Sequence, residues 1–389
     1  MIKQTQTKLF RSSDVGLDFC AGSIIRFPEV FKKILVTGFN PQIVNSVSIS
    51  GSTITLTYGV NHGYVADRVL QVTATGGFNK EVYIDSVTST TVTCTVLDDN
   101  TAGLTGTINT KIASAGWDIV YEVGNIHIYK MKHIDDTDMY VRMCFQTNTA
   151  QRNAVAVCIG KTYDSATGFI TDEHSYTASR NVMLPFAAGV VWNTFYDGNY
   201  NNNASGTFGN AAVIVASPYH LGFSMTERDS QNIFGIFPKS THDYPQLDYP
   251  VLVSQYSGEG IGIPNSANFA RWDNANNAIH IGNIRFEHIL TLPSSSYLPS
   301  SLDEFNTTTL QPYPLIEKNT GQQLGYMYGL FHVQYASNNR PALNRFSTPF
   351  FSTDVDFESL IAVMASTVES SGPHVDYVAF VVEEIKHGI

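Results

Sequence analysis

The sequence predicts a mainly β protein: a β-sandwich-like main domain that carries a small inserted β-sandwich or barrel module, with few short helices. Three observations predict this class. Charged residues make up only 15% of the chain, against roughly 25% in an average soluble protein. The chain is rich instead in Thr, Val, Tyr and Phe, which suit strands, and in Gly, Asn and Ser, which suit turns. Short apolar or alternating segments recur between these turn residues.

We divide the chain into four parts. Residues 1–42 form the N-terminal part of the main domain, and residues 43–112 form the inserted module. Residues 113–320 form the β-rich main domain, and residues 321–389 supply the C-terminal strands that complete it. The module is set apart by its composition, because it is rich in Thr, Ser and Val and holds few Lys or Arg residues.

The first part contains one predicted helix. The apolar residues Val30, Phe31, Ile34 and Leu35 recur at helical spacing. Pro28 precedes them, and proline is favoured in the first turn of a helix because its missing N–H group is not needed there. We therefore expect a short helix that begins near Pro28.

The module shows the two-residue period of half-buried strands. Apolar side chains alternate with threonines over residues 53–58 and again over residues 91–96. Turn residues separate the segments at 50–52, 61–63, 75–77 and 98–100. Several short strands within so few residues predict a small antiparallel sandwich or barrel.

The main domain continues in short strands after residue 117. We expect strands at residues 118–123, 126–131, 140–145, 154–159, 211–216, 233–238, 250–256 and 376–385. Amphipathic helical periodicity is scarce, and residues 357–368 are the one further helix that we expect. Long loops rich in Asn and Ser occupy residues 193–210 and 294–314, and loops of this length in a compact domain are usually functional or contact a partner.

Charge and hydropathy exclude several partners. The net charge of −11 argues against nucleic acid, which requires a basic surface. No apolar run approaches the length of a membrane span, and the first residues lack the apolar core of a secretory signal. The four cysteines are scattered without a CxxC pair, so we expect them to be small buried hydrophobic residues of a protein made in a reducing cytoplasm.

Motifs for catalysis are absent from the sequence. It has no GxSxG, GxxxxGK[ST], GxGxxG or HExxH pattern. The nearest approach to a metal cluster is His127 and His133 with Asp135, Asp136 and Asp138, which we interpret as a solvated hairpin tip, with a Ca²⁺ or transition-metal site as the alternative. We therefore predict no catalytic, cofactor-binding or metal-binding residue, no cofactor and no enzyme activity, with a hydrolase as a minor alternative.

The loop at 193–210 is the strongest candidate for a contact surface. Exposed Tyr and Asn side chains provide contact area at a low cost in conformational entropy. We expect subunit contacts here, with sugar binding as the alternative, through Trp192, Phe195, Tyr196, Tyr200, Asn201 and Asn202.

The segment NHGYVADRV (61–69) raises the question of a site around His62. Asn61 and Gly63 favour a turn, and Asp67 and Arg68 lie at the polar start of the next apolar segment. The module holds no second histidine, and its one cysteine lies on an apolar strand face, so a metal shell around His62 is hard to complete. We predict that His62 caps backbone groups of its own turn.

The module and its flanks resemble structural proteins of tailed-bacteriophage virions. In the module the resemblance lies in "Val-x-Ile-x-Gly…His-Gly-Tyr-x-x-Asp-x-Val", which is similar to small inserted β-modules of those proteins, although Ala66 stands where glycine is usual. The flanks SSDVGLDFCAGSIIRFPEVFKKILVTGF (12–39), AGWDIVYEVGNIHIYKM (115–131) and MYVRMCF (139–145) resemble their N-terminal part, and LGYMYGLFHV (324–333) is similar to a C-terminal strand.

The resemblance implies a non-enzymatic structural subunit of the particle, of the tail or baseplate type. A head-decoration or neck position and a receptor-binding or glycan-binding tail protein are the alternatives. The implied partners are other virion proteins and further copies of this chain in a ring or symmetric array, with a host surface glycan as a possible ligand and with no nucleic acid or membrane. The implied location is the virion, assembled in the host cytoplasm.

Overall fold

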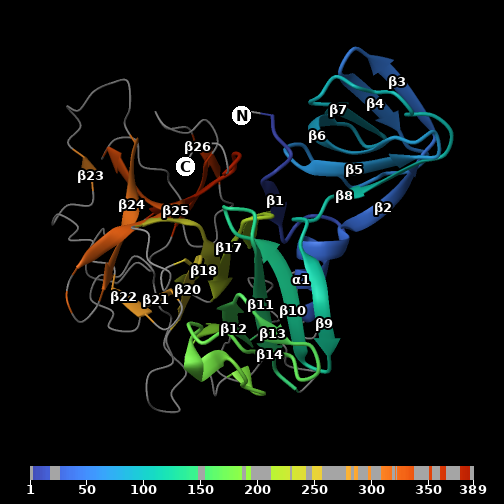
Figure 1. Ribbon diagram of the computed structural model, residues 1–389. Helices are drawn as coiled ribbons and strands as arrows, with labels where there is room; N and C mark the ends of the chain where they lie inside the picture. The colour runs from blue at the N-terminus through green and yellow to red at the C-terminus, as the bar shows by residue number, and fades with distance from the viewer. Residues whose placement is uncertain are drawn as a thin grey trace.

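The structure is a computed structural model of the chain. It describes residues 3–17, 27–147, 154–185, 190–193, 212–227, 230–241, 248–255, 277–281, 284–287, 297–298, 308–317, 320, 322–336, 350–352, 360–364 and 377–385. Figure 1 shows that strands dominate these residues, which confirms the predicted mainly β, sandwich-like class.

Three short helical segments have both ends in the described part of the chain. They are α1 (Phe27–Lys32), the π-helical turn η2 (Lys33–Thr37) that continues it, and the 3₁₀ turn η3 (Thr177–Ser179). The helix predicted near Pro28 is confirmed, and its apolar residues Val30, Phe31, Ile34 and Leu35 are all buried. The ring of Phe31 lies 5.7 Å from that of Phe223, measured between centroids, so this short helix is anchored in the core.

Most strands belong to one 19-stranded hydrogen-bonded sheet, which we call the main sheet. Its strands are β1 (Lys8–Arg11), β9 (Asp118–Val123), β10 (Ile126–Lys132), β11 (Asp138–Phe145), β12 (Ala154–Gly160), β15 (Val191–Asn193), β16 (Val213–Ser217), β17 (His220–Glu227), β18 (Ser230–Phe237), β19 (Lys239–Thr241), β20 (Val251–Gln255), β21 (Asn277–Ile281), β22 (Ile284–Glu287), β23 (Tyr297–Leu298), β24 (Thr308–Glu317), β25 (Gln323–Ala336), β26 (Phe350–Ser352), β27 (Leu360–Met364) and β28 (Tyr377–Val381). A separate two-stranded sheet joins β13 (Tyr163–Asp164) to β14 (Phe169–Ile170).

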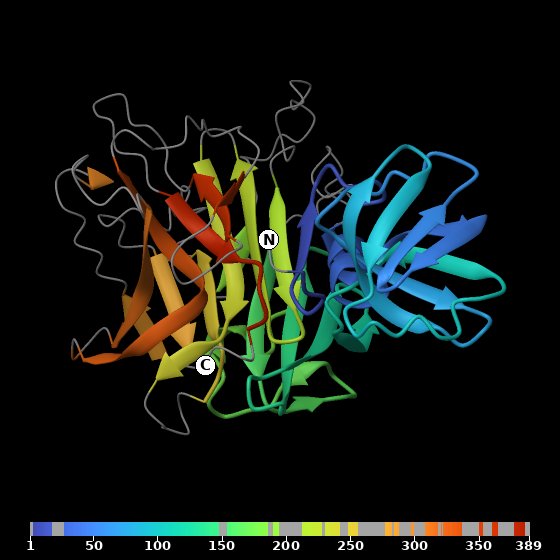
Figure 2. The same cartoon turned by 90° about the horizontal axis from the view of Figure 1, so that it is seen from above.

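Seven further strands form a separate sheet, which we call the module. In spatial order they are β2 (Phe39–Val44), β8 (Ile108–Ile112), β5 (Val69–Ala74), β6 (Asn79–Val87), β7 (Thr91–Thr95), β4 (Thr53–Thr57) and β3 (Ser46–Ser50). All the pairings are antiparallel. Figure 2 shows the module beside the main sheet, next to the N-terminal strand β1.

The threonine alternation predicts the two faces of the module correctly. Ile54 and Leu56 of β4 are fully buried, as are Val92 and Cys94 of β7, while the threonines between them are half-buried. The apolar face therefore lines the interior of the module, as expected for a sheet with one face turned to the core.

The two ends of the module lie next to each other. Phe39 at the start of β2 pairs with Ile112 at the end of β8. Directly after β8, the backbone amides of Ala115 and Trp117 donate to the carbonyl oxygens of Ile34 and Leu35 in η2. The chain thus enters the module directly after η2 and returns to η2 when it leaves the module.

The expected strands of the main sheet are confirmed by β9, β10, β11, β12, β16, β18, β20 and β28. The helix expected at residues 357–368 is wrong, because residues 360–364 form strand β27. This strand pairs on one side with β26 and on the other with β28. A strand inside a sheet can be apolar at every position, and a five-residue apolar run does not distinguish such a strand from a buried helix.

Candidate functional site at the junction of the module and the main sheet

The segment NHGYVADRV forms a loop of the module at its junction with the N-terminal strand. His62 is buried, and its Nδ1 accepts the backbone amide of Tyr64 at 2.9 Å. Its Nε2 lies 3.3 Å from the carbonyl oxygen of Thr91, and its ring stacks on that of Tyr64 at 5.2 Å between centroids. Both ring nitrogens are therefore occupied by backbone groups, which agrees with the prediction that His62 caps its own turn.

Two buried tyrosines bind this loop to β8 and β2, the last and first strands of the module. The hydroxyls of Tyr58 and Tyr64 each lie 3.0 Å from Oγ1 of Thr110 in β8. The Tyr64 hydroxyl also donates to the carbonyl oxygen of Asn40 at 2.8 Å, and Asn40 Nδ2 donates to the carbonyl oxygen of His62 at 2.9 Å. Burial raises the pKa of both tyrosines well above the usual value, so they act as neutral donors and acceptors.

A buried ion pair joins the module to the N-terminal segment. Arg68 donates through Nε to Asp14 Oδ2 at 2.8 Å and through Nη2 to Asp14 Oδ1 at 2.9 Å. The two side chains are only 4% and 6% exposed. Asp14 Oδ2 also accepts the backbone amide of Arg11 at 2.9 Å. A bidentate pair of this kind fixes the orientation as well as the distance of its partners.

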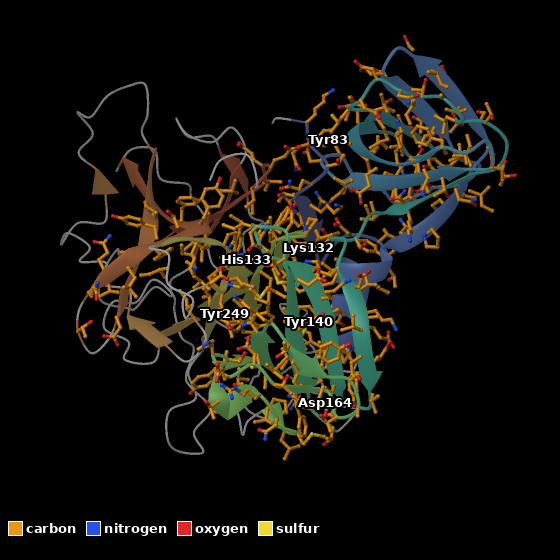
Figure 3. The ribbon with its side chains drawn as sticks, in the orientation of Figure 1. Tyr83, Lys132, His133, Tyr140, Asp164 and Tyr249 are labelled. Carbon is orange, nitrogen blue, oxygen red and sulfur yellow. The ribbon has the colours of Figure 1, made fainter. Side chains whose placement is uncertain are left out.

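Further ion pairs extend this junction along the N-terminal strand. Lys8 of β1 is buried and lies 3.0 Å from a carboxylate oxygen of Glu81 in β6, and Lys3 lies 2.7 Å from one of Asp85. Burial lowers the pKa of Lys8, and the attraction of Glu81 acts in the opposite direction. Tyr83, which Figure 3 places on the side of the module that faces the N-terminal segment, donates its hydroxyl to Asp67 at 2.6 Å. Lys3 and Lys8 thus each have an acidic partner on the module, and Arg68 of the module has its partner on the N-terminal segment.

A second group of polar residues lies at the hairpin between β10 and β11. The ligand atoms of His133, Asp135 and Asp248 lie within 4.8 Å of one another. Figure 3 labels His133 at this end of β10 and Tyr249, the chain neighbour of Asp248. Sequence reasoning identified His133 and Asp135 but missed Asp248, which is distant in the chain and carries no local motif.

One oxygen atom of each carboxylate in this second group has a donor. Asp135 Oδ1 accepts from the amide and the hydroxyl of Thr137 at 2.9 and 2.6 Å, and Lys161 Nζ lies 2.5 Å from Asp248 Oδ2. Burial lowers the pKa of His133, against the attraction of the two carboxylates. The ammonium of Lys161 is the ionic partner of Asp248, so we interpret the group as an ion-paired hairpin. Asp135 is exposed, as predicted, but His133 is buried and not solvated.

A serine and a histidine meet in the hairpin between β16 and β17. Ser217 Oγ lies 2.6 Å from Nδ1 of His220, and both residues are fully buried. Burial lowers the pKa of His220 to about 3, so its imidazole is neutral. The serine carbonyl oxygen accepts Nε1 of Trp117 at 2.8 Å. A nucleophile must be accessible to its substrate, so this pair stabilises the hairpin and does not form a catalytic dyad.

The prediction that Trp192 lies on an exposed contact surface is wrong. Trp192 is completely buried, and its Nε1 donates to the carbonyl oxygen of Val253 at 2.8 Å. Its ring lies 5.2 Å from that of Phe223. The other predicted contact residues lie outside the described part of the chain: Phe195, Tyr196, Tyr200, Asn201 and Asn202.

The described cysteines are buried thiols. Cys94, Cys144 and Cys158 are free and buried, and Cys20 lies outside the described residues. Burial raises the pKa of Cys144 to about 11 and that of Cys158 to about 12. These thiols therefore remain protonated at neutral pH, which removes the form that reacts or binds metal.

Comparison of the chain with protein-family models, with curated proteins and with solved structures gives no match. Among the residues described here, no helix is long and apolar enough to cross a membrane.

Proposed function

We propose that the chain is a non-enzymatic structural subunit that assembles through repeated contacts between subunits. The observation that carries this proposal is the set of contacts made by the segment NHGYVADRV (61–69). His62 caps backbone groups of its turn, and Tyr64 binds the carbonyl oxygen of Asn40 in β2. Arg68 forms a buried ion pair with the N-terminal segment. The segment that resembles a virion module therefore joins the module to the N-terminal segment, and such a second β-sheet can present surfaces in an assembly.

We propose, more particularly, that the assembly is a tailed-phage virion and that the subunit lies in its tail or baseplate. The resemblance of the module and its flanks to structural proteins of such virions supports this proposal. Its partners are then other virion proteins and copies of the same chain in a ring or symmetric array. Head-decoration and neck positions are the alternatives within the same class.

The experiment uses particles produced from the genome that encodes the chain. Particles are purified on a density gradient, the chain is quantified by mass spectrometry, and its fold is fitted into a reconstruction of the whole particle. We expect several copies per particle, with the two sheets visible as separate densities at the tail end. A chain that stays in the soluble fraction, at less than one copy per particle, overturns the proposal.

The glycan-binding alternative is weakened by the burial of Trp192, because a buried indole offers no face to a sugar ring. A glycan array probed with the purified chain tests it directly. Binding that is lost on Tyr196→Ala and kept on Tyr129→Phe, a change at a buried ring of β10, supports glycan recognition and removes the purely structural proposal.

A further inference from the structure

The module presents one open strand edge. In its strand order β3 stands at one end and β2 at the other, and β3 pairs with β4 alone among the strands described. Figure 1 shows β3 on the side of the module that is turned away from the main sheet. Strand edges with unpaired N–H and C=O groups bind further strands unless some feature blocks them.

The edge at β2 carries such blocking features, whereas the edge at β3 does not. Pro41 in β2 has no N–H group, Asn40 has a positive φ of 53°, and the register with β8 shifts between Phe39 and Gln42. Proline and irregular register both prevent a further strand from pairing. Strand β3 reads Ser-Val-Ser-Ile-Ser, without proline, charge or bulge in its pairing to β4.

The hairpin between β3 and β4 decides which backbone groups are free. Ser50 pairs with Thr53 across a two-residue turn, in which Gly51 has a φ of 60°. Two-residue turns close on a hydrogen-bonded pair, so Ser50 and Ser48 direct their backbone groups to β4. The alternate residues, Val47 and Ile49, therefore direct their N–H and C=O groups to the open edge.

The apolar face of the module is also incomplete at this edge. Val47 lies opposite Leu56 and Ile49 lies opposite Ile54, and both partners in β4 are fully buried. Val47 is half-buried, and Ile49 is 45% exposed. A further strand would extend this face and cover both side chains, which stabilises the contact through the hydrophobic effect.

We infer that the partner of β3 is the β3 strand of a second copy of this chain, paired antiparallel about a two-fold axis at Ser48. The sequence Ser-Val-Ser-Ile-Ser is nearly symmetric about its centre, so Val47 of each copy faces Ile49 of the other and exchanges both backbone hydrogen bonds with it. Serines then face serines on the opposite side of the sheet. Such an isologous contact closes on itself and gives a dimer.

The charge distribution permits two copies to approach at this edge. The chain carries a net charge of −11, so two copies repel each other in general. Residues 41–66 contain no Asp, Glu, Lys or Arg, and residues 86–97, which include β7, contain none either. The half of the module next to β3 is therefore the neutral part of a charged molecule.

This inference deepens the proposed structural role, but it is tested on the purified chain, separately from membership of a virion.

The first test compares two exposed isoleucines at the two edges of the same sheet. Ile49→Lys introduces a charge at the open edge, and Ile43→Lys introduces the same charge at the blocked edge, where Ile43 is 66% exposed. Sedimentation velocity follows each full-length protein from roughly 1 µM to roughly 300 µM, the range of weak association. We expect dimers of the unchanged chain and of Ile43→Lys, and a dissociation constant at least about tenfold weaker for Ile49→Lys. An unchanged chain that stays monomeric, or equal effects of the two changes, overturns the inference.

The second test places a cysteine on the proposed axis, in a chain with Cys20→Ser. Ser48→Cys brings two thiols together as a non-hydrogen-bonded antiparallel pair, a position whose spacing suits a disulfide. The control Ser46→Cys lies on the same face of the sheet. In the proposed dimer, residue 46 of one copy lies opposite residue 50 of the other, so the two cysteines are four residues apart along the strands, or about 14 Å at ~3.4 Å per residue. Mild oxidation should yield a covalent dimer of Ser48→Cys and little of Ser46→Cys. Equal yields, with circular dichroism spectra like that of the unchanged chain, overturn the inference.

The two proposals can fail independently. A chain that is found in purified particles but shows no association through β3 keeps its structural role and loses this contact. A chain that dimerises through β3 but is absent from particles keeps the contact and loses the virion role.

Discussion

The ion pair between Asp14 and Arg68 gives the sharpest test of how the module is attached. Asp14→Asn keeps the shape of the side chain but removes its charge. The guanidinium of Arg68, which is 4% exposed, then stays buried without its counter-charge. Breaking a buried pair on one side typically costs about 3–5 kcal/mol. We expect the free energy of unfolding to fall by that amount.

The double change Asp14→Asn with Arg68→Met removes both charges together. It should cost clearly less than the sum of the two single changes, with a coupling of about 1–3 kcal/mol, because residues in direct contact do not act additively. Each variant is measured by chemical denaturation followed by tryptophan fluorescence. The matched control is Asp98→Asn at the exposed pair with Lys80, whose atoms lie 2.6 Å apart. A salt bridge in solvent contributes little, so this control should unfold like the unchanged chain.

Two results would refute this reasoning. The first is a loss for Asp14→Asn no greater than that for Asp98→Asn, which would mean that the junction pair is solvated. The second is strict additivity in the double variant, which would mean that the two side chains do not interact.

Three further predictions follow from other buried positions. Burial lowers the pKa of His220 to about 3, well below its unfolded value of about 6.5. The neutral, buried His220 therefore contributes its full stability above about pH 6.5, and this contribution is lost as the pH falls toward 3. Replacing it with Asn should flatten the pH dependence of unfolding in that window by up to about 1.4 kcal/mol per pH unit, and equal slopes would contradict the assignment. Gly38→Ala should destabilise the chain clearly more than Gly51→Ala. Both positions have a positive φ, and this left-handed backbone alone costs an alanine about 1–2 kcal/mol. At position 38 a Cβ would in addition lie 2.2 Å from a backbone carbonyl oxygen of β8. Cys144 and Cys158 should resist thiol reagents at pH 8 until the chain unfolds, and peptide mapping that finds either residue labelled in the folded protein would contradict their burial.

Local patterns were sufficient for most of the strands and for the turn around His62. Alternation of apolar residues with threonine identifies β4 and β7, because burial of one sheet face imposes a period of two on the sequence. The helix at Pro28 was predicted for the same kind of reason, since both its start signal and its apolar positions lie within a few residues of each other. The capping role of His62 was also local, because its Nδ1 accepts an amide two residues away.

The features that the sequence could not predict depend on distant partners. Arg68 was expected only as part of a polar strand start, and it pairs instead with Asp14, 54 positions earlier. Trp192 was expected at the surface because an exposed loop follows it, but aromatic residues of α1 and β17 enclose its ring. Asp248 reaches His133 only through the fold. A one-dimensional pattern does not contain these contacts.

The neighbouring ends of the module have a consequence for the history of the chain. Because the module begins and ends beside η2, a gene segment that encodes residues 39–112 can be gained, lost or exchanged without rerouting the remaining strands. Its loss would leave a trace, since Lys8 and Asp14 would lose Glu81 and Arg68, their ionic partners on the module. Related chains that lack the module should therefore not be restricted to Lys and Asp at these two positions, and chains with a different insert should supply new ionic partners there.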